Sequence, residues 1–151
     1  PLYSSAASDV YKRQIYEYEL GSWNEWHLVF NDNTSGWLSD AQLDYAVSMP
    51  AQAGQALPAG EDLQRGQSFT FFGVTLQVTS LTRARYRGVE GDLPFEYWDK
   101  QEVLFADLRS ADRRFGTIDY SESPPLLFLG EAVEFEDLRM SRLKEFEGWR
   151  R

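Results

Sequence analysis

Aromatic and acidic side chains alternate near the start of the chain, and together they have the chemistry of a cation-binding site. The residues are Tyr16, Glu17, Tyr18, Glu19, Trp23 and Glu25. An aromatic face attracts an ammonium group by about 0.5 to 2 kcal/mol, and neighbouring carboxylates add charge attraction. The pattern therefore predicts a site for a polyamine or for the lysines of a protein partner.

The tryptophans of this region also allow a structural interpretation. Trp26 and Trp37 fit the core of a small β domain. Trp23 shares one face of an extended strand with Glu25, because side chains two residues apart point the same way. We therefore expect Trp23 to lie on the surface and to form the binding face with Glu25.

A second acidic group surrounds a predicted hairpin further along the chain. Its members are Asp107, Asp112, Asp119 and Glu122. Paired carboxylates can serve hydrolysis or bind a hard cation. In a chain this acidic, however, solvated turn residues are the favoured interpretation.

The chain has one histidine, His27, and no cysteine. Serine- or cysteine-type catalysis and cysteine-ligated zinc therefore lack their usual residues, and we expect neither enzymatic activity nor a cofactor or metal site in this fragment. Alternation places His27 opposite Trp26 and Leu28, which predicts a surface or cross-strand role. Residues 31–36 (NDNTSG) resemble the start of a calcium loop, but Gln42 stands where that loop needs a glutamate, so we expect a hairpin turn.

Composition excludes several kinds of partner. The net charge of −9 at pH 7 disfavours nucleic acid and anionic lipid, both of which attract lysine and arginine clusters. The longest apolar run, Leu126–Leu129, is too short to cross a bilayer. We expect a cytoplasmic module, without a transmembrane segment in this fragment, that takes a protein partner or a small cationic ligand.

Residues 4–14 (SSAASDVYKRQ) resemble the in-frame translation of a transposon-based sequencing-library adapter. Such segments are excluded from reasoning about a fold, so we treat residues 1–14 as not native. We expect natural sequence to start near Ile15, inside a longer protein. Any pairing of Val10 to Lys12 with the first natural strand would then be adapter filling a vacant position.

Period-two alternation predicts an all-β fold with two related small antiparallel β units, arranged as a sandwich or as partly open barrels. The strands predicted in the second unit include residues 102–108, 115–120, 126–129 and 132–138. Residues 15–49 form the first unit, truncated at its start, and residues 60–151 form the second with a C-terminal segment. The uncharged, proline-bracketed residues 50–59 are the predicted linker. The units repeat weakly, with Trp37-Leu38-Ser39 over Thr117-Ile118-Asp119, although any two amphipathic hairpins alternate alike. The spacing of Met140, Leu143 and Phe146 predicts a short terminal helix.

Four segments together resemble the bacterial domain-of-unknown-function 4178 family: residues 21–42 (GSWNEWHLVFNDNTSGWLSDAQ), 90–95 (EGDLPF), 106–110 (ADLRS) and 115–131 (FGTIDYSESPPLLFLGE). The resemblance implies a further strand before Ile15, in the place of the adapter. Some members carry a cysteine-type zinc ribbon beside the domain, which implies zinc in a flanking segment. The family defines no catalytic residue, and its genes tend to lie near those for aminopropyltransferase-like and membrane-stress proteins.

Three functional hypotheses follow. The leading one is a non-catalytic interaction or regulatory module of a larger bacterial protein, in an envelope-stress or polyamine-linked system. The alternative is a cation- or polyamine-binding module that uses the acidic and aromatic face. A weaker alternative is a carboxylate-dependent hydrolase.

Overall fold

The computed structural model describes residues 13–91 and 101–140, and this part of the chain is almost entirely β-structure. The elements in chain order are β1 (Arg13–Tyr18), β2 (Gly21–Val29), β3 (Ser35–Ala41), β4 (Asp44–Ala51), the 3-10 turn η1 (Gly60–Asp62), β5 (Ser68–Phe71), β6 (Val74–Glu90), β7 (Glu102–Arg109), β8 (Arg114–Asp119), β9 (Leu126–Val133) and the 3-10 turn η2 (Phe135–Leu138). The all-β prediction is confirmed.

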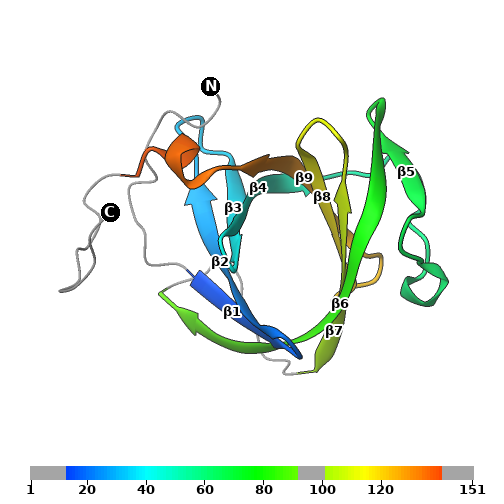
Figure 1. Cartoon of the computed structure of the whole chain (residues 1–151), viewed down its shortest axis with the longest axis horizontal. Coiled ribbons are helices and arrows are strands. Elements are labelled where there is room, and N and C mark those ends of the chain that lie inside the picture. The colour runs from blue at the N-terminus through cyan, green and yellow to red at the C-terminus, as the bar shows by residue number, and fades with distance from the viewer. Residues whose placement is uncertain (1–12, 92–100, 141–151) are drawn as a thin grey trace.

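The strands form one closed antiparallel barrel of eight strands with a ninth strand outside it (Figure 1). Neighbours around the barrel are β1-β2-β3-β4-β9-β8-β7-β6, and β1 pairs again with β6 to close the ring. The long strand β6 extends beyond the barrel and there pairs with β5. The structure therefore shows a closed barrel, where the sequence left open a sandwich or partly open barrels.

The barrel consists of two four-stranded meanders that pair edge to edge. Strands β1 to β4 form one meander and β6 to β9 the other, and the seams between them are the β1–β6 and β4–β9 pairs. Leu38 in β3 and Ile118 in β8 hold equivalent, buried positions. Gly36 and Gly116, two residues earlier in the same strands, correspond in the same way. Strands from before and after residues 50–59 thus share one sheet, and Pro50 and Ala51 are part of β4.

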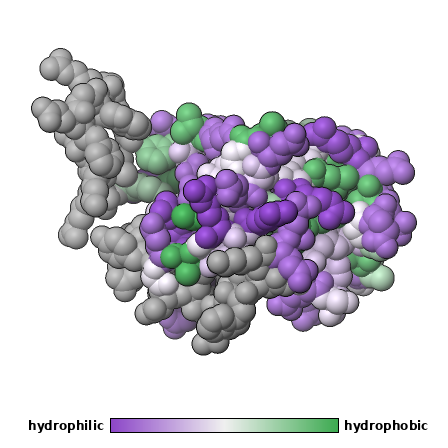
Figure 2. Space-filling model, turned by 90° about the horizontal axis from the view of Figure 1, so that it is seen from below, coloured by the Kyte–Doolittle hydropathy of each residue, from purple (hydrophilic) through white to green (hydrophobic). Residues whose placement is uncertain are grey.

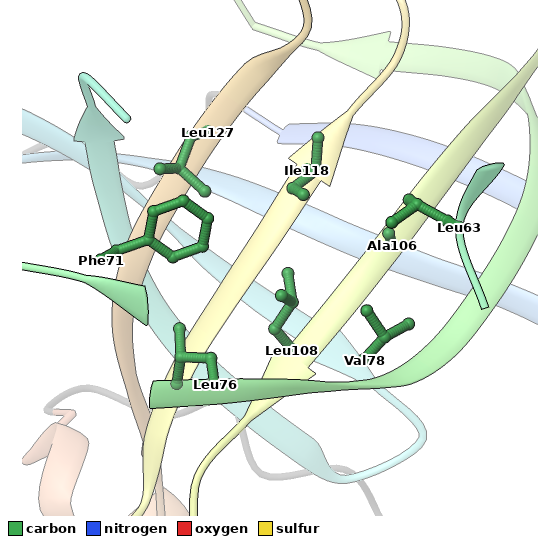
Figure 3. Close-up of a cluster of buried hydrophobic side chains, with 8 residues drawn as sticks. All are labelled: Leu63, Phe71, Leu76, Val78, Ala106, Leu108, Ile118 and Leu127. Atoms are coloured by element: carbon green, nitrogen blue, oxygen red, sulfur yellow. The ribbon is translucent and has the colours of Figure 1, made fainter. Parts of the chain in front are cut away.

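The main apolar core lies on the outer face of the barrel wall, under β5 and the segment that leads to it. We call this cluster the outer core, and Figure 3 shows its side chains gathered on one side of the β6 to β9 wall. Its members are Leu63, Phe71, Leu76, Val78, Ala106, Leu108, Ile118 and Leu127. A smaller outer cluster joins Leu38, Val47 and Val133, with Trp26 and Leu28 packed against it.

The remaining sequence predictions concern turns and the C-terminus. Residues 30–34 form the predicted hairpin turn, in which the Asp32 carboxylate accepts hydrogen bonds from the backbone N–H and the hydroxyl of Thr34. Of the predicted helix, Leu143 and Phe146 lie outside the described residues, as does the pairing of Val10 to Lys12. Within the described ranges, no helix is long and apolar enough to cross a membrane.

Candidate functional site: the barrel lumen

A large cavity occupies the inside of the barrel, which we call the lumen, and continues over the rim formed by residues 50–57 and 121–126. Its total volume is about 1810 Å³. Side chains alternate between the outer core and the lumen along each strand, so the residues between the core positions point inward. Those that line the lumen include Glu25, Trp37, Ser48, Asp107, Thr117 and Asp119.

Glu25 is a lumen residue whose ionisation is strongly perturbed. Its two carboxylate oxygens accept hydrogen bonds from Trp23 Nε1 at 3.0 Å and from Gln14 Nε2 at 2.6 Å. Burial raises the pKa of Glu25 to about 7, and the negative charges of Asp119 and Asp107 act in the same direction. The side chain keeps some exposed surface because it borders the cavity, not bulk solvent.

Asp107 and Asp119 face the same lumen from neighbouring strands. Asp107 lies opposite Thr117, whose hydroxyl bonds to it, and Asp119 accepts a hydrogen bond from the Ser121 backbone N–H at 2.7 Å. Burial raises the pKa of both carboxyl groups. The two residues are diagonal neighbours in the sheet, which places them about 7–8 Å apart. Paired catalytic carboxylates have separations of this size. The geometry is therefore compatible with the hydrolase hypothesis, which stays a prediction.

Aromatic rings fill the side of the lumen next to β1, β2, β6 and β7. We call Tyr16, Trp23, Tyr86 and Phe105 the aromatic plug. Tyr16 stacks on Trp23 at a centroid distance of 5.0 Å, and Trp23 meets Phe105 edge-on at 5.3 Å. Since β2 and β7 are not neighbours in the sheet, the Trp23–Phe105 contact crosses the inside of the barrel. The plug leaves the open part of the lumen beside Glu25, Asp107 and Asp119.

An ion pair also crosses the inside of the barrel. Arg109 Nη2 at the end of β7 lies 2.5 Å from Asp44 Oδ2 at the start of β4, and these two strands are not neighbours. The same guanidinium lies over the Phe115 ring, 5.5 Å from its centroid. Arg109 is one of four arginines that border the cavity, together with Arg65, Arg83 and Arg85, and it is paired with Asp44.

The structure separates the six residues of the predicted acidic and aromatic face. The prediction that Trp23 lies on the surface is wrong, because its side chain is only 9% exposed and belongs to the plug. Tyr16, Trp23 and Glu25 point inward, whereas Glu17, Tyr18 and Glu19 border the cavity at its rim. Glu17 and Glu19 are exposed there, and Glu17 pairs with Arg87 at 3.2 Å. The surface face predicted from sequence is therefore an internal site at Tyr16, Trp23 and Glu25.

The second acidic group is divided in the same way. Asp107 and Asp119 point into the lumen, whereas Asp112 is exposed in the β7–β8 turn, where the Ser110 hydroxyl donates to it. Glu122 is exposed in the β8–β9 turn at the cavity rim. The interpretation of all four as solvated turn residues holds for Asp112 and Glu122 and is wrong for the other two.

His27 has the predicted cross-strand role. It pairs with Trp37 of β3, and the two rings meet edge-on at 5.1 Å. In the described part of the chain, no three histidine or acidic side chains come together in a way that could hold a metal ion.

Sequence reasoning missed that Asp107 and Asp119 act together with Glu25. A signal was present, since each aspartate interrupts an apolar strand segment, FADL in β7 and TIDY at the end of β8. An aspartate between two outward-facing apolar residues must point to the opposite face of the sheet. The non-local β1–β6 closure, which turns that face into an interior, has no local sequence signal.

These features define the class of the protein: a closed antiparallel β-barrel whose lumen is lined by acidic, polar and aromatic side chains. The chain belongs to the family described as domain of unknown function (DUF4178), whose model matches residues 7–135. The match begins within the segment that we expect to be adapter, and that expectation stays a prediction. No curated protein and no solved structure matches the chain.

Proposed function

We propose that the barrel binds a small organic cation, of the polyamine type, inside its lumen. The observation that supports this most is the meeting of Glu25, Asp107 and Asp119 in one cavity, whose described lining holds twice as many acidic side chains as arginines. Burying carboxylates without counter-charge is unfavourable, which is why the pKa of each is raised. An ammonium ligand would relieve that cost.

The walls of the lumen suit the rest of such a ligand. Trp37, Phe115 and Phe128 line the cavity beside the carboxylates. Methylene segments can pack on these rings, and an ammonium group over a ring face gains about 0.5 to 2 kcal/mol. An anionic ligand would instead be repelled by the carboxylates, and a purely apolar one would leave them without a partner.

Calorimetric titration with spermidine at low salt tests the proposal. We expect saturable binding by the wild-type chain and weaker binding by Glu25→Gln and Asp119→Asn. Glu90→Gln is the matched control, because Glu90 is an exposed carboxylate that pairs with Arg13 at 2.6 Å and does not border the cavity. Absence of heat at millimolar spermidine would contradict the proposal. If the control variant weakens binding equally, the heat comes from surface charge, and this result would also contradict the proposal.

The interaction-module hypothesis has its own supporting observation. Leu20 and Leu43, 78% and 82% exposed, occupy the tips of two hairpins that Gln42 connects by donating to the Leu20 carbonyl oxygen. Leu43 has a φ of 73°, a conformation that costs energy for this residue type. Figure 2 shows one face of the molecule, which is mostly hydrophilic with small, separate hydrophobic areas. Under this hypothesis, a complex of the full-length protein is lost in the double variant Leu20→Ser/Leu43→Ser and kept in Glu17→Gln.

A further inference from the structure

Among the described residues, the groups that act on the Glu25 carboxylate are hydrogen-bond donors and other carboxylates, and none is cationic. Trp23 and Gln14 each donate to one carboxylate oxygen. Ser39 faces Glu25 from β3, and His27 follows on the same face of β2. From the far wall, β7 and β8 contribute Asp107 and Asp119, which are both acidic.

The other two carboxylates are better compensated than Glu25. Asp107 has the Arg109 guanidinium as an electrostatic neighbour, together with the Thr117 hydroxyl. Asp119 accepts hydrogen bonds from the backbone and side chain of Ser121 in the adjoining turn. The pKa of Glu25 is raised to about 7, so the charge of this group changes near neutral pH.

We propose that the lumen exchanges a proton for its ligand: Glu25 is protonated in the empty barrel and releases its proton to solvent when a cation binds beside it. This inference rests on the proposed function. The ammonium group supplies the positive charge that Glu25 lacks, so the ionised carboxylate becomes stable once the ligand is present. The ammonium group that binds beside Glu25 replaces the released proton charge for charge, and any further ammonium groups of a polyamine face the other carboxylates of the lumen.

A further observation indicates that this part of the lumen can accept a ligand N–H group. The side chain of Gln14 is 5% exposed and borders the cavity, and its Oε1 has no hydrogen-bond partner. A buried carbonyl oxygen without a donor is unfavourable, and an ammonium group brings several donors. Position 14 lies in the segment expected to be adapter, so the proposal depends on Glu25 and Trp23. Gln14 shows in addition that this wall of the lumen presents a hydrogen-bond acceptor to the cavity.

The test measures proton release and binding together. Spermidine is titrated into the full chain at about pH 6 and about pH 8.5, each in two buffers of different ionisation enthalpy. The neighbouring ammonium groups of spermidine lower one another's pKa, so the same titrations are made with a monoamine of the lysine type, which keeps its proton in this range. We expect release of about one proton at the lower pH and almost none at the higher one, with affinity rising about tenfold per pH unit below pH 7. Glu25→Gln should bind without proton release and with an affinity that changes little with pH, whereas Asp119→Asn should bind more weakly and still release the proton.

The possible results separate this inference from the proposed function. Saturable binding without proton release at the lower pH overturns the exchange and leaves the binding site intact. If proton release persists in Glu25→Gln, the proton comes from another group, and this result also overturns the proposed exchange at Glu25. Absence of binding overturns both proposals. If Glu25→Gln does not fold, Trp23→Phe replaces it: loss of the Nε1 donor should move the midpoint of proton release to higher pH, and an unchanged midpoint would contradict the role of Glu25.

Discussion

The two faces of strands β7 and β8 have opposite chemistry. On the outer face, Leu108 and Ile118 are fully buried in the outer core. On the inner face, Asp107 and Asp119 alternate with them and border an open cavity. Small eight-stranded barrels usually fill their interior with side chains or keep room for one small ligand. Here the apolar packing that stabilises the fold lies largely outside the barrel, which leaves the interior to carry polar groups.

The difference implies that stability and binding can be changed independently, although the residues concerned are neighbours in sequence. Carboxylates facing a cavity cost folding energy, because burial raises the pKa of each one. A protein keeps such groups when they perform a function that apolar residues cannot. The predictions below compare the two faces in order of decreasing expected effect.

The largest effect is expected for Leu108→Ala. Truncation leaves a cavity in the outer core and should lower the free energy of unfolding by about 2–5 kcal/mol. The matched control is Asp107→Asn, one position away on the opposite face, which should change stability by less than about 1 kcal/mol or raise it at neutral pH, because the folded state disfavours its charge. Urea unfolding measures both variants. Similar losses in the two would show that the lumen is as tightly packed as the outer core.

Glu25→Gln should remove a pH dependence of stability. The pKa of Glu25 is 4.5 when unperturbed and about 7 in the folded chain. Below pH 4.5 Glu25 is protonated in both the folded and the unfolded state. Between pH 4.5 and about 7 the unfolded state loses this proton and the folded state keeps it, so the free energy of unfolding of the wild type falls as pH rises. The loss through this group is roughly 3 kcal/mol at order-of-magnitude precision. Urea unfolding from pH 4.5 to 8 should show a smaller decline in the variant, and parallel curves would contradict the assignment.

Local patterns were sufficient to predict most strands. The prediction of a strand from residue 102 to 108 nearly coincides with β7, and the one from 115 to 120 with β8. Residues 126–129 and 132–138 were predicted as two strands, but a single strand, β9, runs through Gly130 and Glu131. Closure was not predictable, because the β1–β6 and β4–β9 pairs join segments distant in sequence.

The site shows the same division between local pattern and long-range closure. Alternation correctly placed Trp23 and Glu25 on one face, opposite Trp26 and Leu28. It could not show that this polar face points inward, because a polar lumen and a solvent-facing surface have the same two-residue period. Only closure of the barrel makes the face internal, and with it the burial that perturbs Glu25.

Arg109→Gln should strengthen cation binding modestly. The substitution removes one of the cations that border the lumen and frees Asp44, so the affinity for spermidine at low salt should rise about two- to fivefold, as expected for a partly exposed ion pair. Calorimetric titration beside wild type measures the change. Arg87→Gln is the control, since Arg87 is exposed and does not border the cavity. A weaker affinity in Arg109→Gln than in this control would show that Arg109 positions the ligand and does not compete with it.

The smallest effect on stability is expected at Gln14, where the lumen wall meets the segment that resembles adapter. Gln14→Leu removes a hydrogen bond to Glu25, which is unfavourable, and also removes the unpaired buried Oε1, which is favourable. These contributions oppose each other, so the unfolding free energy should change by less than about 1 kcal/mol. Trp23→Phe removes the other donor to Glu25 without such compensation and should cost about 1 kcal/mol. Urea unfolding of both at pH 8, where Glu25 is ionised, measures the contrast. If Gln14→Leu lowers the free energy of unfolding by more than about 2 kcal/mol, the side chain of residue 14 is an integral part of the lumen wall. That result would contradict the adapter interpretation.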